Sequence, residues 1–254
     1  MRFASLGSGS RGNALIVEAG GTRVLVDCGF GPRQLAVRMG RLGLEPGDLD
    51  AILITHEHSD HVAGAAPCAR RHELDVFLTH GTLGALTLDG VSIQVIDSHT
   101  VFAIGNIEVR PFPVPHDARE PAQFVFSDGH DSLGVLTDAG CVTPHMVEML
   151  SVCDALVLEC NHDIDMLTAG RYPAHLKQRI SGRFGHLDNT ASADLLARLD
   201  HRRLRHVVAA HLSQENNTPE LARAALAAVL GCDANWIGVA DQDTGFDWRV
   251  ISGG

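Results

Sequence analysis

The feature that most constrains this chain is a run of metal-binding side chains directly after an apolar strand. The predicted strand at residues 50–55 leads into the H-x-H-x-D-H run of residues 56–61 (HEHSDH). Side chains two residues apart in an extended chain point to the same side, so His56 and His58 can bind one metal ion. The helix that follows presents Asp60 and His61 toward a second ion. A surface turn in a histidine-rich chain is the alternative, but the spacing favours a two-metal centre.

Further candidate ligands each follow an apolar predicted strand later in the chain. They are His116, Asp138 and His211. Taken singly, each would be interpreted equally well as a capping aspartate or an exposed histidine. Together with residues 56–61 they predict that several strands deliver ligands to one rim of a sheet.

Composition excludes several classes of protein. Hydrophobic residues make up 45% of the 254 positions, which is enough for a substantial core. No apolar run approaches the roughly 20 residues of a membrane helix, and we expect no secretory signal. The six cysteines are scattered without a C-x-x-C pair, so we expect free, buried thiols in a cytoplasmic protein. The net charge of −11 argues against undirected nucleic-acid binding but leaves room for a local basic track.

Hydrophobic patterning predicts a layered α/β fold with sheets between helices. The first half is rich in strands and tight turns, and the second half alternates helices with strands. Strands are predicted at 2–6, 14–18, 23–27, 50–55, 75–78, 92–96, 155–159, 206–210, 236–239 and 246–251. Residues 101–113 and 123–137 are predicted to be rich in β-structure, with turns at 105–106 and 128–129. Helices are predicted at 32–40, 60–72, 82–88, 144–151, 173–182, 189–199 and 219–230.

Residues 55–61, followed in order by the three later ligands, resemble the signature of the metallo-β-lactamase-fold superfamily. The resemblance implies a four-layer αββα sandwich formed by residues 1–254 as a single domain. It also implies two divalent metal ions. The ligands of one ion would be His56, His58 and His116. Those of the other would be Asp60, His61 and His211, with Asp138 bridging the two ions. Asp27 is similar to an early aspartate of the superfamily that supports a ligand from outside the metal site.

Segments of the second half resemble one branch of this superfamily. They are residues 156–163, 171–173, 176–180, 185–189 and 210–217, and the opening segment 8–13 joins them. These segments are similar to the WalJ/YycJ family, bacterial cytoplasmic proteins regarded as DNA 5′→3′ exonucleases. His186 and the later segment 211–213 are also similar in order to motifs of tRNA-processing RNase Z, although no long arm for gripping tRNA is evident.

The chemistry of the candidate residues agrees with phosphodiester hydrolysis. Two metal ions roughly 4 Å apart stabilise an attacking hydroxide, held between them, and the phosphoryl oxygens. We expect Asp60 to orient this nucleophile and His186 to donate a proton or hydrogen bond near the leaving oxygen. His162 is a possible additional ligand or substrate contact. Imidazole-rich ligation suits zinc, and mixed ligation also accepts manganese or iron.

Candidate substrate contacts lie in two segments. No acidic residue occurs between Asp165 and Asp188, whereas four cations do: Arg171, Lys177, Arg179 and Arg183. This stretch would attract a phosphate backbone, or it is simply a solvated helix face. Ser8 and Arg11 lie in a glycine-rich loop whose amides could face an anion, although an ordinary hairpin loop is equally consistent.

Three functions remain open on sequence alone. A two-metal phosphodiesterase acting on DNA rather than RNA fits best. A small-molecule metallohydrolase acting on a thioester, a lactone or a small phosphodiester is the alternative. A non-enzymatic regulatory or scaffolding protein would commonly have lost some of the ligands. We expect no membrane partner, and the oligomeric state is not readable.

Overall fold

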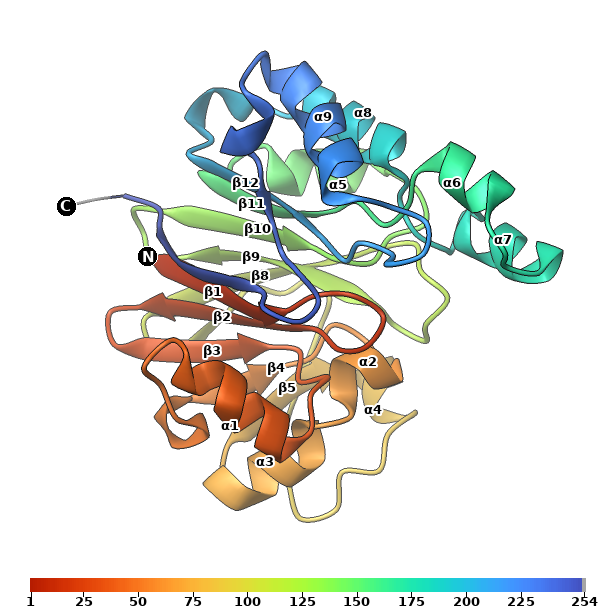
Figure 1. Cartoon of the computed structure of the whole chain (residues 1–254). Helices are drawn as coiled ribbons and strands as arrows, with labels where there is room; N and C mark the ends of the chain where they lie inside the picture. Colours follow the sequence, from red (N-terminus) through yellow and green to blue (C-terminus); the bar gives the residue numbers. More distant parts are fainter. Residues whose placement is uncertain (253–254) are drawn as a thin grey trace.

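Two mixed β-sheets lie face to face in the computed structural model of the chain, which describes residues 1–252 (Figure 1). Within these residues each sheet has seven strands. The first has the order β14-β1-β2-β3-β4-β5-β6, with strands Arg2–Gly7 (β1), Ala14–Ala19 (β2), Thr22–Val26 (β3), Ala51–Leu53 (β4), Asp75–Thr79 (β5), Ser92–Ile96 (β6) and Phe246–Val250 (β14). The second has the order β13-β12-β11-β10-β9-β8-β7, with strands Phe102–Ile104 (β7), Ile107–Pro113 (β8), Ala122–Ser127 (β9), Ser132–Leu136 (β10), Ala155–Glu159 (β11), His206–Ala210 (β12) and Gly238–Val239 (β13).

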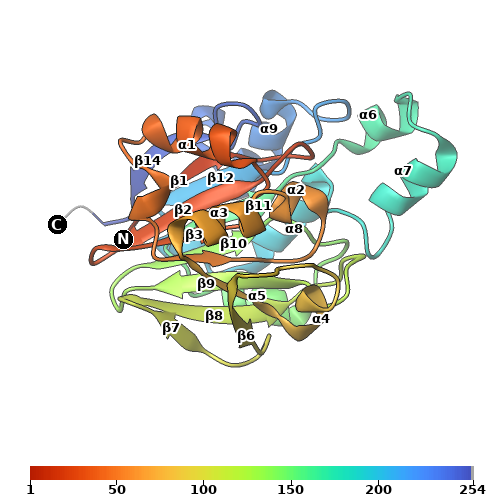
Figure 2. The ribbon, with the colours of Figure 1, turned by 90° about the horizontal axis from the view of Figure 1, so that it is seen from below.

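Helices cover the outer face of each sheet, so the αββα layering is confirmed (Figures 1 and 2). The first sheet is covered by α1 (Pro32–Gly40) and α3 (Ala65–His72), with the short α2 (Ser59–Val62) and α4 (His80–Leu83) nearby. The second sheet is covered by α5 (Pro144–Leu150), α8 (Asn189–Arg198) and α9 (Pro219–Leu230). The short 3-10 helices span Pro46–Asp48 (η1), His201–Arg203 (η2) and Ala234–Trp236 (η3).

Two short helices project from the body instead of covering a sheet (Figure 1). They are α6 (Ile164–Ala169) and α7 (Ala174–Ile180). We call residues 163–185, which contain both helices, the arm. The acid-free basic stretch of the sequence therefore lies on a projecting segment.

Alternation along the strands explains why the sheets are buried on both faces. In β4, Ala51 and Leu53 face the other sheet, whereas Ile52 faces the helices. In β11, Val157 belongs to the core between the sheets and Leu158 to the core beneath α5, α8 and α9. A strand with apolar residues on both faces needs cover on both sides, and the four layers provide it.

Parallel strands bring their carboxyl ends to one edge of the molecule. In the first sheet β3, β4 and β5 are parallel, and in the second β10, β11 and β12 are parallel. Asp27 follows β3, and residues 56–61 lie after β4. Asp138 and His211 follow β10 and β12, and Glu159 ends β11. The edge where the sheets meet therefore receives ligand side chains from both halves of the chain.

Most predicted elements match, and the differences have local causes. The predicted helix 60–72 is instead two helices, because Gly64 turns the chain between them. Its N–H donates to the Cys28 carbonyl over 2.7 Å, and a Cβ there would collide with the Phe30 carbonyl. The helix predicted at 82–88 is the shorter α4, which starts earlier because Thr79 caps it. Trp236 ends a 3-10 helix instead of starting a strand, and α6 was not predicted.

The cysteines are free in the described residues, and four of the six are buried, whereas Cys141 and Cys232 are partly exposed. Within residues 1–252, no helix combines the length and apolar character that crossing a membrane requires.

Candidate metal centre

Three histidine rings converge where β4 and β8 end. The Nε2 atom of His56 lies 3.0 Å from Nδ1 of His58, and Nε2 of His116 lies 3.3 Å from the same atom. Burial lowers the pKa of His56 and of His116, which favours the neutral form of both rings. Neutral nitrogens at this separation present lone pairs to a common point. The three rings can therefore hold one cation.

A second group of ligands lies beside the first. Nε2 of His61 is 3.4 Å from Oδ2 of Asp60, and Nε2 of His211 is 3.5 Å from the same oxygen. Burial alone would lower the pKa of His61, but the carboxylates of Asp138 and Asp27 outweigh it and raise that pKa to about 10. This group has more negative charge than the first and can hold a second cation.

Asp138 lies between the two groups. One carboxylate oxygen, Oδ2, is 3.3 Å from Nε2 of His61. The other, Oδ1, is 3.1 Å from Nδ1 of His211 and 3.9 Å from Nε2 of His116. Burial alone would raise the pKa of Asp138, but His211 and His61 hold it well below its usual range. A carboxylate that faces both groups is in the position of a bridging ligand.

Buried polar atoms at the centre show that its residues fit metal ions. Oδ2 of Asp138 and both ring nitrogens of His211 are buried, and among residues 1–252 they have no partner with hydrogen-bond geometry. Such atoms are costly to leave unsatisfied. Five imidazoles and two carboxylates converge here, and they are typical of a dinuclear metal site.

A hydrogen-bond network fixes the ligands from outside. His61 donates from Nδ1 to Oδ2 of Asp27 over 2.7 Å, and the Thr55 hydroxyl donates to the same carboxylate over 3.0 Å. Nδ1 of His56 in turn lies 2.9 Å from the Thr55 oxygen. Asp27 has a φ of 59°, a left-handed conformation unusual for a residue with a side chain. This strain is typical of functional sites.

The loop that carries His211 is also strained and held. His211 has a φ of 54°, and its N–H donates to the Ser8 hydroxyl over 2.9 Å. Asn161 donates to the His211 carbonyl over 3.0 Å. The Ser8 hydroxyl is therefore buried and holds a ligand loop, and its backbone N–H donates to the Asp241 carbonyl over 3.2 Å, so a substrate contact of Ser8 stays a prediction. Asn13, which sequence reasoning missed, donates its amide to Oδ2 of Asp60 over 3.2 Å.

Glu159 is the second residue that sequence reasoning missed. It is fully buried at the end of β11, and its Oε1 lies 2.7 Å from Nδ1 of His186. Its Oε2 accepts backbone N–H groups of Ala139 and Leu187. The sequence does contain a signal for this residue. Glu159, like Asp138, is an acid at the end of an apolar strand, where the strands bring polar side chains to one edge of the sheet. The pair fixes the ring of His186 at the edge of the centre.

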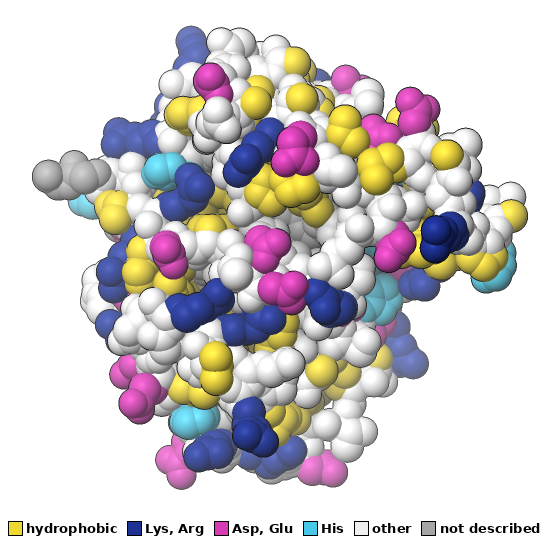
Figure 3. Space-filling model, in the orientation of Figure 1, with side chains coloured by type: hydrophobic (Ala, Val, Ile, Leu, Met, Phe, Trp, Pro, Cys, Tyr) yellow, Lys and Arg dark blue, Asp and Glu magenta, His cyan; other side chains and the backbone are white. Residues whose placement is uncertain are grey.

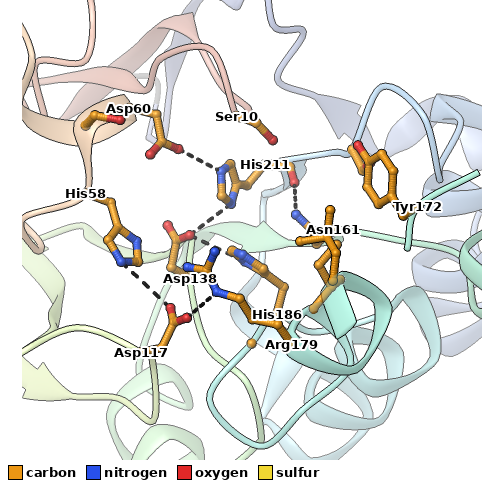
Figure 4. A pocket seen from close by; sticks show the side chains of 15 residues that line it. Ser10, His58, Asp60, Asp117, Asp138, Asn161, Tyr172, Arg179, His186 and His211 are labelled. Carbon is orange, nitrogen blue, oxygen red and sulfur yellow. Dashed lines mark hydrogen bonds and ion pairs between the residues drawn. The ribbon is translucent and has the colours of Figure 1, made fainter. Parts of the chain in front are cut away.

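A cavity of about 390 Å³ opens beside the ligands. Figure 4 shows His58, Asp60 and His211 at its base, with Asp117 and Arg179 facing one another across one end and Tyr172 at the other. Further lining residues on the arm are Leu176 and Ile180. The cavity therefore has a polar floor and a partly apolar wall that the arm provides.

The other predicted substrate contacts are not among the residues that line this cavity. Arg11 forms an ion pair with Asp243 at 2.9 Å, and Lys177 donates to the Thr168 carbonyl within the arm. Arg183 is exposed on the arm and does not line the cavity, so Arg179 is the predicted contact that the structure brings to it. Acidic and basic side chains are interspersed on the face of the body drawn in Figure 3. His162 is buried but belongs to none of the ligand clusters found among residues 1–252.

Comparison with known proteins agrees with this geometry. The family model of the beta-lactamase superfamily domain matches residues 22–215. Exodeoxyribonuclease WalJ of Streptococcus pneumoniae is 33% identical over 98% of this chain and 93% of its own length. Exodeoxyribonuclease YycJ of Bacillus anthracis is 36% identical over 91% of this chain and 89% of its own. This chain belongs to the WalJ/YycJ family of the metallo-β-lactamase superfamily.

A solved structure supports the fold of this superfamily member. The metallo-beta-lactamase fold protein YhfI of Bacillus subtilis superposes with a TM-score of 0.76, at 15% identity and with 98% of each chain covered. The family and the clustered ligands together identify a metal-dependent hydrolase. The resemblance inferred from residues 55–61 and the later segments is thus confirmed.

Proposed function

We propose that this protein is a dinuclear-metal-dependent phosphodiesterase, and specifically a 5′→3′ DNA exonuclease that uses zinc or manganese. The observation that carries the proposal is the cavity, because candidate metal ligands, a guanidinium (Arg179) and a candidate proton donor (His186) all line it. The two relatives that cover nine-tenths of the chain are named exodeoxyribonucleases, which supports DNA as the substrate.

The ligand set is assigned as the geometry suggests. One ion would be held by His56, His58 and His116, and the other by Asp60, His61 and His211, with Asp138 shared. When bound, two such cations supply Lewis acidity for water activation and neutralise charge on a phosphoryl group. Asp60 is partly exposed to the cavity, so it also orients the attacking water.

His186 acts on the leaving group. Its Nδ1 hydrogen is directed to Glu159 at 2.7 Å, so Nε2 is the nitrogen available to substrate. The ring lies 5.1 Å from that of His116 and 5.2 Å from that of His211, centroid to centroid. A proton donated from Nε2 would therefore reach a substrate oxygen bound beside the metal centre. Glu159 would stabilise the positive charge that the His186 ring carries while it is doubly protonated.

The arm is assigned to the nucleic acid. Arg179 is the cation that reaches the cavity, and the aromatic ring of Tyr172 can stack on a base while Arg179 contacts a phosphate. The exposed cations Arg171 and Arg183 extend this positive charge along the arm. Because the rest of the protein is acidic, the positive charge of the arm would direct a phosphate backbone to the arm and the cavity beside it.

The test uses metal-stripped protein reloaded with Zn²⁺ or Mn²⁺. It is assayed on single- and double-stranded DNA labelled at the 5′ end or the 3′ end. We expect release of the 5′ label as nucleotides, abolished by chelation and restored by metal. Equal activity in a fully chelated sample would overturn the proposal. So would turnover of thioesters, lactones or small phosphodiesters far above that of DNA, which would establish a small-molecule hydrolase.

A further inference from the structure

Asp117 occupies an unusual position between the arm and the centre. It follows His116 in the loop after β8, and its Oδ2 accepts a hydrogen bond from Nε of Arg179 over 2.6 Å (Figure 4). Its other oxygen, Oδ1, lies 3.8 Å from Nε2 of His58 and 3.5 Å from Nε2 of His116. One carboxylate therefore faces a cation of the arm on one side and two candidate metal ligands on the other.

Within residues 1–252, the outward nitrogen of the candidate ligand His58 has no hydrogen-bond partner. Its Nδ1 faces the cluster, because this atom lies 3.0 Å from Nε2 of His56 and 3.3 Å from Nε2 of His116. Its Nε2 must then carry the hydrogen and point outward. A metal-bound imidazole usually donates this hydrogen to a carboxylate or carbonyl, which fixes the ring and strengthens the ligand.

The neighbouring ligands already have such partners. Nδ1 of His61 is 2.7 Å from Asp27, and Nδ1 of His116 is 2.9 Å from the Gly185 carbonyl. The outward nitrogen of His58 faces Asp117 across 3.8 Å, which is beyond hydrogen-bond distance. The carboxylate that would complete the pattern is bound to Arg179 instead.

We propose that Asp117 is a positioning residue with two alternative partners, Arg179 on the arm and the outward nitrogen of His58, and that it couples the arm to the metal centre. A phosphate group that binds Arg179 releases Asp117, which then accepts the hydrogen of His58. The inference rests on the metal site and the phosphate-binding arm of the proposed function, and it adds a regulation of that site.

The exchange is physically reasonable because both partners of the ion pair are accessible. The side chains of Arg179 and Asp117 are 61% and 30% exposed, so water solvates both and the pair is readily broken. A phosphate matches the forked geometry of a guanidinium at least as well as a carboxylate does. A phosphate bound to Arg179 favours the hydrogen bond between His58 and Asp117. Because that bond strengthens His58 as a ligand, thermodynamic linkage requires the phosphate to tighten metal binding as well.

The test measures zinc affinity by competition with a chromogenic chelator, with folding checked by circular dichroism. The variants are D117N, R179Q, R183Q and the double variants of D117N with each arginine change. R183Q is the matched control, because it removes the same charge from the arm, and Arg183 forms no ion pair within residues 1–252. We expect D117N to weaken zinc binding about tenfold. R179Q should tighten it more than R183Q does.

The decisive comparison is made in the D117N background. There R179Q and R183Q should have equal effects, because no carboxylate remains to be released. An excess effect of R179Q that persists without Asp117, or equal effects of both variants in the wild type, would overturn the inference.

Inorganic phosphate provides an independent readout. Phosphate can also bind the metal directly, so the comparison is between proteins. It should tighten zinc binding more in the wild type than in D117N, and equal tightening would contradict the coupling. None of these measurements uses DNA cleavage. A failed nuclease assay would therefore overturn the proposed substrate alone, whereas a failed affinity cycle would overturn the coupling alone.

Discussion

Nδ1 of His186 lies 2.7 Å from Oε1 of Glu159, and the remaining oxygen of this carboxylate is fixed by backbone N–H groups on both sides. The acid is fully buried, whereas the histidine is partly exposed to the cavity. A buried acid held by two backbone N–H groups therefore sets the orientation of the His186 ring, which is the proton donor of the proposed function.

Glu159→Gln should lower kcat by about 100-fold, which is at the low end of general acid–base contributions, with little change in KM. The amide still fills the space but no longer stabilises a charged His186. Steady-state kinetics on labelled DNA measure the effect, and elemental analysis should show normal metal content. Loss of metal together with activity would instead assign Glu159 to the ligand set.

Asp138→Ala should remove both metal content and activity, because this carboxylate lies within 3.3 Å of His61 and 3.1 Å of His211. Its removal also takes one counter-charge away from two buried histidines, so the metal-free variant should unfold at lower temperature. Metal analysis and thermal melting measure the two effects. Full metal occupancy in this variant would disprove the bridging role.

Asp27→Asn should weaken metal binding by about 10- to 100-fold, as expected for a partner that orients a ligand from outside. The buried carboxylate accepts hydrogen bonds from both His61 and Thr55, and an amide accepts only in part. Competition with a chelator measures the affinity. Arg11→Gln, at an exposed pair with Asp243, is the control and should leave the affinity unchanged.

Tyr172→Ala should raise KM for DNA by about 5- to 150-fold, corresponding to roughly 1–3 kcal/mol for the stacking of one base on an aromatic ring. Tyr172→Phe keeps the ring and should behave as the wild type. The ring lies at the end of the cavity away from Asp117 (Figure 4), so kcat should change little. Equal defects in both variants would assign the effect to the hydroxyl group.

Local patterns predicted the layers and the rim of the sheets. The boundaries of α1, β11, β12 and α9 agree with the sequence because hydrophobic period and capping residues are local signals. Thr218 caps α9 and Pro219 begins it, as expected. The same local logic, polar residues after apolar strands, brought His116, Asp138 and His211 to one place. Their roles as ligands stay a prediction.

Contacts between distant residues could not be predicted. The sequence places Ser8 in a glycine-rich loop, but the group that donates to its hydroxyl, the N–H of His211, lies 203 positions away. In the sequence, Arg179 is one of four equivalent cations between Asp165 and Asp188. Its pairing with Asp117, which distinguishes it from the other three, spans 62 positions. The break at Gly64 follows from the chain segment that passes beside it, which no helical period encodes.

The ligands come from both sheets, and this has a consequence for the order of events during synthesis. Residues 56–61 emerge early, but His211 follows the strand β12, near the end of the chain. A ribosome-bound chain that stops before this strand contains six of the seven candidate ligands and lacks only His211, so the second group of ligands is still incomplete. Completion of the candidate metal centre therefore waits for the synthesis of β12 and the residue that follows it.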